Sequence, residues 1–150
     1  MTTSSFDKYL MADHRACDQQ LGALRKQAGA GDWAAARSSS QALQHDVLAH
    51  FAAEEDVLFP AFEASTGMRG GPTQVMRMEH EEARLLLEDL LAAVFGQDAD
   101  GVRGHGEALL ILLQQHNMKE ENILYPTALA YAGSSAPELT AQIIQRREAV

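Results

Sequence analysis

The sequence predicts an all-α protein: an antiparallel up-down-up-down four-helix bundle over about residues 5–131, followed by a short C-terminal fifth helix over about 136–148. Two observations lead to this fold class. Apolar residues make up 46% of the 150-residue chain, with Ala and Leu prominent and β-branched residues few, which favours helix over sheet. Long segments with helical spacing of apolar residues are separated by short loops, which make successive helices antiparallel. The length suits one domain over residues 1–150.

The first hairpin begins with a helix expected over about 5–28, where apolar residues recur at helical spacing. Gly31 lies just beyond its end, as is typical of a helix stop. Asp32 is placed to cap a second helix that continues to about Ser65. Because Pro60 lies inside this second helix, we expect a kink or an early end there.

The second hairpin repeats this organisation after a glycine-rich loop. Pro72 suits the first turn of a third helix, which is expected to end near Phe95. A short turn leads to a fourth helix that runs to about Tyr131, again with a proline, Pro126, near its end. Residues 135–138 read SAPE, a capping-box pattern that opens the fifth helix.

The strongest feature of the sequence is an internal repeat. Residues 50–60 read HFAAEEDVLFP and residues 116–126 read HNMKEENILYP, at an offset of 66 residues. The same offset carries His14 onto His80, and in each half the two histidines are 36 residues apart. The chain therefore consists of two helical hairpins, each with one H-x35-H-x3-E frame. Two such hairpins pack most simply about a pseudo-two-fold axis.

The repeated frame has the chemistry of a metal site. Residues four apart lie on one face of a helix, so the histidine and glutamate of each copy can point together into the bundle. Six side chains are expected to converge at one level of the interior: His14, His50, Glu54, His80, His116 and Glu120. Imidazole nitrogens suit iron, zinc, copper and nickel, and a carboxylate can bridge two cations. Two histidines per metal and two bridging glutamates describe a dinuclear site with open positions.

The repetition distinguishes this frame from a surface ion pair and from a chance occurrence. A lone H-x-x-x-E pair is usually a surface pair or a chance event. Here both pairs occur in the same eleven-residue frame, and burying six polar side chains without a partner would be costly. No histidine follows a glutamate by three residues, which argues against a ferritin-type frame. The H-E-x-x-H pattern of metalloproteases is also absent.

These motifs resemble the hemerythrin-like family, the HHE cation-binding domain, over roughly residues 6–131. The resemblance implies an antiparallel four-helix bundle with a non-haem di-iron centre. The implied ligands are His14 and His50 for one iron, His80 and His116 for the other, and Glu54 and Glu120 as bridges between them. Zinc could substitute for iron, because the same ligand types bind it.

We also expect particular roles for several residues beside the frame. Oxygen-carrying hemerythrins have a second histidine one turn after the third-helix ligand, and Arg84 stands at that position here. Asp18, at the matching position on the first helix, is expected to support the site or lie at the surface rather than bind metal. Cys17 is expected to be a small core residue. Phe59 and Tyr125 occupy matching positions and are expected to be packing aromatics, with a hydrogen bond from Tyr125 near the site as the alternative.

Two histidines and two glutamates are expected to stay outside the ligand set. His45 lies on a different face of the helix from His50, so we expect it to be exposed to solvent or to serve in packing. His105 is about 16 Å along the helix axis from the fourth-helix ligand, too far to share its metal. Glu55 and Glu121 follow the proposed bridges but point roughly 100° away, which favours capping, salt bridges or contacts to the ligands.

The composition excludes several classes of function. The formal net charge is −9, and a strongly acidic chain repels phosphate backbones, so no nucleic-acid or membrane partner is expected. The single cysteine excludes an intrachain disulfide and a thiolate cluster. The N-terminal segment lacks the pattern of a secretory signal, and no apolar stretch reaches the roughly 18–20 residues of a membrane span. We therefore expect a soluble, cytoplasmic protein.

Three functional hypotheses follow. The first is a non-haem di-iron protein that binds or senses oxygen or nitric oxide, a metal-binding protein rather than a turnover enzyme, with no catalytic residue assigned. The second is an enzyme-like role in nitric oxide or peroxide detoxification or in iron-centre repair. Bacterial repair proteins that share the domain often carry an extra cysteine-containing N-terminal region, which is not expected here. The third is a metal-stabilised regulatory module whose fifth helix meets a protein partner.

Overall fold

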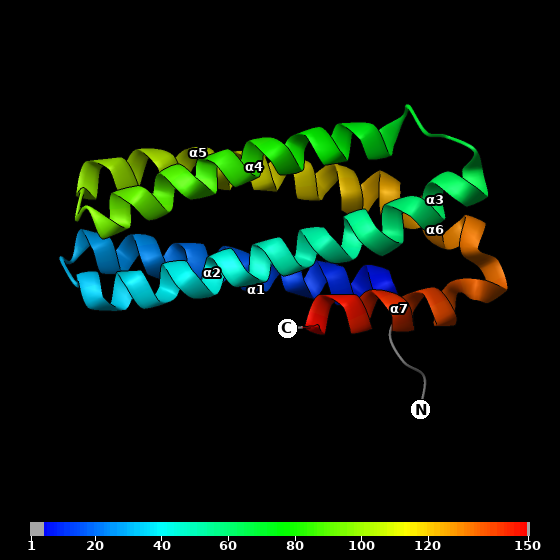
Figure 1. Cartoon of the computed structure of the whole chain (residues 1–150), viewed down its shortest axis with the longest axis horizontal. Coiled ribbons are helices and arrows are strands. Elements are labelled where there is room, and N and C mark those ends of the chain that lie inside the picture. Colours follow the sequence, from blue (N-terminus) through cyan, green and yellow to red (C-terminus); the bar gives the residue numbers. More distant parts are fainter. Residues whose placement is uncertain (1–4, 150) are drawn as a thin grey trace.

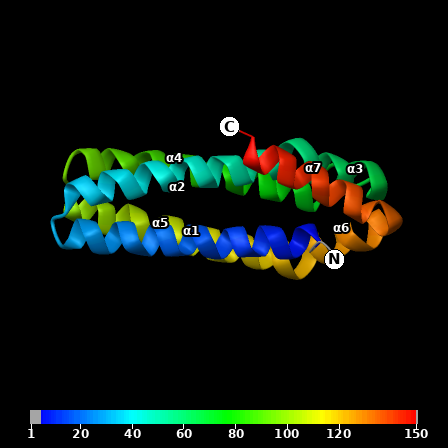
Figure 2. The same ribbon diagram turned by 90° about the horizontal axis from the view of Figure 1, so that it is seen from below.

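The computed structural model describes residues 5–149 and shows an antiparallel four-helix bundle (Figure 1). The bundle helices are α1 (Phe6–Gly29), α2 (Trp33–Ala53), α4 (Pro72–Phe95) and α5 (Ala99–Lys119). A wide helical turn, η1 (Glu54–Leu58), joins α2 to α3 (Phe59–Thr66), and η2 (Glu120–Leu124) joins α5 to α6 (Tyr125–Ala132). After the short turn η3 (Gly133–Ser135), α7 (Ala136–Glu148) folds back along the bundle (Figure 2). The predicted all-α fold is confirmed, and residues 5–149 contain no strand.

The helix ends follow the sequence signals, with one exception. Gly31 adopts a left-handed conformation with φ of +76° just after α1. The side chain of Asp32 accepts a hydrogen bond of 3.2 Å from the backbone N–H of Ala35 and so caps α2, as predicted. The capping box expected at residues 135–138 does not form. Ser135 already has helical backbone angles in η3, so its side chain makes no capping hydrogen bond.

The two prolines inside the long helices are accommodated by turns of π-helix. In η1 the backbone N–H of Phe59 donates to the carbonyl of Glu54, five residues earlier rather than four. Pro60 has no N–H to donate, and its ring needs space beside the preceding turn. The wider turn lies directly before it, and the helical path continues into α3. The sequence had predicted a kink or an early end at Pro60, and the early end does not occur. The same turn recurs in η2 before Pro126.

Two apolar clusters fill the bundle, one on each side of the level where the predicted ligands lie. On α1, for example, His14 lies between Leu10 of one cluster and Cys17 of the other. Each of α1 and α4 packs against both α2 and α5, which closes the bundle around this level. The polar residues are therefore shielded by apolar side chains above and below. Among the described helices, none combines the length and apolarity needed to cross a membrane.

Candidate metal centre

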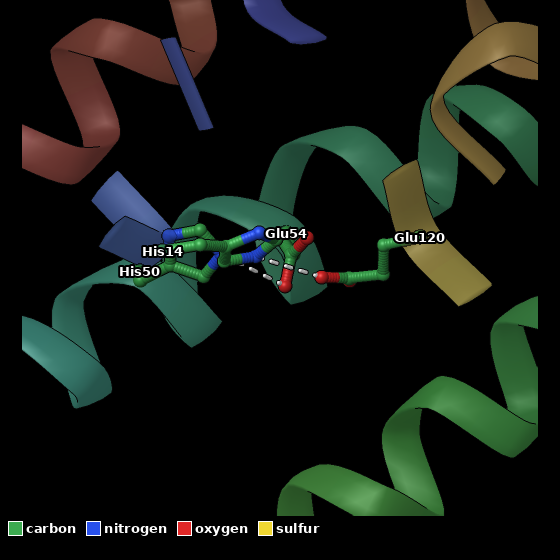
Figure 3. A group of neighbouring side chains, drawn as sticks. All are labelled: His14, His50, Glu54 and Glu120. Carbon is green, nitrogen blue, oxygen red and sulfur yellow. Dashed lines mark hydrogen bonds and ion pairs between the residues drawn. The ribbon is translucent and has the colours of Figure 1, made fainter. Parts of the chain in front are cut away.

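All six side chains of the repeated frame meet in the interior. They are almost completely buried, with exposed fractions of 6% for His14, 3% for His50, 2% for His116, and 0% for Glu54, His80 and Glu120. They form two groups in which the ligand atoms lie within 4.8 Å of one another. One group holds His14, His50, Glu54 and Glu120, and the other holds Glu54, His80, His116 and Glu120. Figure 3 shows the first group, with the two imidazoles facing the carboxylates.

The two glutamates belong to both groups and connect them. Oε1 of Glu54 lies 3.4 Å from Nε2 of His50 and 3.2 Å from Nε2 of His80. Glu120 also faces two imidazoles but uses both oxygens, with Oε1 3.1 Å from Nε2 of His14 and Oε2 3.3 Å from Nε2 of His116. Each carboxylate thus faces one histidine of each group, as a ligand that bridges two cations would.

Three buried atoms at the centre of this arrangement have no hydrogen-bond partner. They are Nε2 of His50, Oε1 of Glu54 and Oε2 of Glu120. Each unpartnered buried polar atom costs about 1–3 kcal/mol, and all three would find a partner in a cation. Nitrogen and carboxylate donors together suit divalent transition metals. The residues present therefore fit a dinuclear metal centre.

A carboxylate holds the far nitrogen of every imidazole. The four Nδ1 contacts are His14 to Glu121 at 2.7 Å, His50 to Asp13 at 2.8 Å, His80 to Glu55 at 2.6 Å and His116 to Glu79 at 2.9 Å. When Nδ1–H donates to these oxygens, the lone pair of Nε2 is directed to the centre of the bundle. The four contacts obey the pseudo-two-fold relation of the repeat. This arrangement orients all four rings for metal binding.

The site has an excess of negative charge that attracts protons in the absence of a metal. Burial lowers the pKa of His50, but Glu54 and Asp13 outweigh burial and raise it to about 10. His116 behaves in the same way, because Glu120 and other carboxylates raise its pKa to about 9. Burial raises the pKa of Glu54, but the neighbouring imidazoles lower it well below its usual range. Without a metal, the raised pKa values of His50 and His116 favour protonated imidazoles, which place positive charge where a metal cation would otherwise lie.

Comparison with known proteins agrees with this geometry. A family model described as hemerythrin HHE cation binding domain matches residues 5–128. The chain belongs to this family. Among its relatives is the iron-sulfur cluster repair protein YtfE of Enterobacter sp. (strain 638), 31% identical over an alignment of 102 residues; the match covers 59% of this chain and 44% of the relative. The YtfE protein of Escherichia coli O81 (strain ED1a) is 33% identical with the same coverage. The chain thus spans less than half of these relatives, and no solved structure matches it.

One aromatic residue of this hemerythrin-like domain contributes more than packing. The hydroxyl of Tyr125 is completely buried and lies 2.6 Å from Oε2 of Glu54 and 3.0 Å from Oε1 of Glu120. Burial and these two carboxylates raise the pKa of Tyr125 well above its ordinary value, so the hydroxyl remains a hydrogen-bond donor. Phe59, its counterpart in the repeat, packs as predicted, with its ring centroid 5.5 Å from that of His80.

Arg84 supports one ligand from outside the ligand groups. Its guanidinium donates to both oxygens of Glu55, at 2.8 and 3.0 Å, and Glu55 accepts from His80. It also lies 5.4 Å from the ring centroid of Phe51, whose ring stacks on His80 at 3.8 Å. Where oxygen-carrying relatives have a further histidine, this chain thus has a cation that holds the carboxylate partner of His80.

A small cavity adjoins the first group of ligands. Its volume of about 20 Å³ is enough for one water molecule. His14, His50, Asp18 and Cys17 are among its lining residues. Oδ1 of Asp18 is buried without a hydrogen-bond partner, and burial raises the pKa of this carboxyl. Asp18 is outside both ligand groups and lines this cavity beside them.

The remaining expectations concern residues around the site. The side chain of His45 is 60% exposed and contacts Asp46 at 3.2 Å, away from the ligand groups, and His105 is also outside them. Glu55 and Glu121 contact ligand imidazoles, one of the roles expected for them. The sequence analysis assigned no role to Asp13 and Glu79, the acidic residues that directly precede His14 and His80. The repeat contains the signal, because an acid precedes a histidine in both copies.

Proposed function

We propose that the chain is a non-haem di-iron protein. One iron would be held by His14 and His50, the other by His80 and His116, with Glu54 and Glu120 bridging them. The observation that carries this proposal is the set of three buried, unpartnered ligand atoms at the point where the two groups share their glutamates. Membership of a cation-binding family and the iron chemistry named for the relatives support iron as the metal.

The chain's own residues would bind the metals, fix their ligands and limit access of water. When bound, the iron pair would supply redox chemistry and open coordination positions. The carboxylates at Nδ1 keep Nε2 of each histidine free to bind. The hydroxyl of Tyr125 holds a bridging carboxylate in place, 2.6 Å from Glu54. Phe51 and Phe59 cover the ring of His80 and restrict solvent there.

We further propose that the centre binds a small diatomic molecule, oxygen or nitric oxide, for sensing or handling. The water-sized cavity beside His14 and His50 supports this function, because it gives a small molecule room next to one metal position. Arg84 replaces the histidine that oxygen carriers have at the other position, which would leave coordination open there as well.

Iron-centre repair is a second candidate function, favoured by one observation. The relatives with 31–33% identity are iron-sulfur cluster repair proteins, although the chain spans only 44% of their length. The two functions are distinguished by the fate of the iron. A diatomic-binding protein retains both ions through repeated cycles of ligand binding and removal, whereas a repair protein transfers iron to a cluster-free acceptor.

An anaerobic iron titration tests the proposed ligand set. Wild-type protein is expected to bind two irons per chain and to change its absorption spectrum on exposure to oxygen or nitric oxide. His50→Ala and His116→Ala are expected to abolish dinuclear binding, while His45→Ala and His105→Ala keep the wild-type stoichiometry. Fewer than one iron per wild-type chain, or an equal loss in His45→Ala, would contradict the assignment. Replacement of iron by zinc should preserve the stoichiometry but not the spectral response.

A further inference from the structure

We propose that α7 is a functional part of the metal centre. Arg147 holds Asp13, Asp13 orients His50, and docking of α7 therefore favours metal binding at the His14/His50 position. In return, metal at this position stabilises the docked helix. The inference rests on the proposed ligand set and adds a regulatory element to it.

A continuous chain of short contacts connects α7 to His50. Asp13 accepts from Nδ1 of His50 at 2.8 Å. Arg147 donates to both oxygens of the same carboxylate, at 2.7 and 2.9 Å, and its guanidinium also lies 3.4 Å from Asp46. The side chains of Asp13 and Arg147 are each only 13% exposed. A two-point guanidinium–carboxylate pair has a fixed geometry, so the position of α7 determines the orientation of Asp13.

At the other metal position the matching carboxylate, Glu79, is held from its own hairpin and not by α7. Glu79 accepts from Nδ1 of His116, and its second partner is Lys119. Lys119 belongs to α5, the same helix as His116, so the second hairpin itself holds the carboxylate that orients His116. By contrast, α7 packs along α1, α2 and η1, on the side of the molecule away from α4 (Figures 1 and 2). The two otherwise pseudo-symmetric positions therefore differ in what supports them.

The attachment of α7 is limited, which makes the Arg147 pair important for it. Only two residues of this 13-residue helix are buried, Ile143 and Thr140, and a helix of this length is marginal on its own. Thr140 accepts a hydrogen bond of 3.1 Å from the backbone N–H of Phe6. Arg146, one residue from Arg147, makes a comparable contact with Asp56 at 3.0 Å, but the two side chains are 41% and 56% exposed. That pair lies at the surface, and Asp56 is not one of the four carboxylates that hold the imidazoles.

Linkage gives this arrangement a measurable consequence. If docking of α7 orients His50, metal binding must favour docking by the same factor. Loss of the partner that orients a ligand histidine typically weakens metal binding by about 10–100-fold. Loss of Arg147 leaves Asp13 present but no longer held, so we expect a loss at the lower end of this range, about tenfold. The loss should fall on one metal position, because Lys119 and not α7 holds Glu79, the carboxylate partner of His116.

The test compares Arg147→Gln with Arg146→Gln, which removes the same charge from the same helix. Anaerobic titration of the full chain with Fe(II), followed by calorimetry, should give two ions per wild-type chain. In Arg147→Gln one of the two affinities should fall by about tenfold, and in Arg146→Gln neither should change. Hydrogen exchange over residues 136–148 supplies a second measurement: metal should slow exchange in wild type and in Arg146→Gln, but much less in Arg147→Gln.

The outcomes separate this inference from the proposed function. A wild-type chain that binds fewer than two ions contradicts the di-iron proposal itself. If wild type binds two ions but Arg147→Gln matches Arg146→Gln in both measurements, the role of α7 is overturned. Exchange in wild-type protein needs no variant, so the inference remains testable if Arg147→Gln does not fold. Equal exchange of α7 with and without metal also overturns it.

Discussion

Replacing Tyr125 with Phe removes one hydroxyl from the centre of the site and leaves the ring in place. That hydroxyl is completely buried and lies 2.6 Å from Glu54 and 3.0 Å from Glu120. Its single proton can serve one carboxylate at a time, so Tyr125→Phe loses one hydrogen bond to a charged group. Such a bond contributes about 1.5–3 kcal/mol. We expect the metal-free protein to lose about 2 kcal/mol of stability, or about 4–8 °C in Tm for a chain of this length.

Urea unfolding of metal-free protein, followed by circular dichroism, measures this loss directly. Tyr131→Phe is the matched control, because Tyr131 lies on the same helix, α6, and is 55% exposed. The control should unfold within about 0.5 kcal/mol of wild type. With metal bound, the carboxylate oxygens have another partner, so the effect of Tyr125→Phe should shrink. If Tyr125→Phe and Tyr131→Phe have equal stability without metal, the hydroxyl does not hold the carboxylates as described.

Three further predictions follow from the charges and burial of the site. In metal-free protein the pKa values of His50 and His116 are about 10 and 9, above the ordinary 6.5, so their contribution to stability is complete below about pH 6.5 and is lost as pH rises to about 10. Urea midpoints measured across this range should fall with rising pH, and a flat profile would contradict the raised values. Metal must displace these protons, so calorimetry at neutral pH in buffers of different ionisation enthalpy should show proton release. A heat independent of the buffer would refute this. Cys17 is 7% exposed, and burial first, then Asp13 and Asp46, raise its pKa to about 12. It should react with a thiol reagent at least about a hundredfold more slowly in folded than in urea-unfolded protein, and equal rates would show that the thiol is accessible.

The fold was largely predictable because its signals are local and repeated. Helical periodicity, glycine stops and the Asp32 cap define segments whose short connections allow few topologies. The π-helical turns were not predictable, because proline indicates only that an ordinary helix cannot continue unchanged. Whether the chain kinks, ends or widens depends on what its neighbours can pack against. In this bundle the wide turns begin at Glu54 and Glu120, where the two carboxylates must reach the centre.

The convergence of the six frame residues was predictable, but most of their support was not. Spacing of four residues on a helix and an offset of 66 residues between halves are visible in one dimension. The contact from Asp13 to His50 joins two helices, and the contact from Arg147 to Asp13 joins residues 134 apart. Tyr125 is similar: its position in the repeat matches a phenylalanine, and only the packed structure shows where the hydroxyl lies. The repeat marks Asp13 and Glu79 as matching acids, but it does not indicate which distant side chain each one contacts.

The crossed carboxylate contacts have a consequence for how the chain is held together. His14 on the first hairpin depends on Glu121 of the second, and His80 on the second depends on Glu55 of the first. Neither hairpin therefore orients all of its own histidines, and each ligand group takes one glutamate from each hairpin. A bound pair of ions would thus act as a cross-link between the hairpins. A backbone cut in the loop at residues 67–71 should leave two fragments that copurify while metal is bound and separate more readily after chelation. The bound ions would then do more to hold the two hairpins together than the peptide loop that connects them.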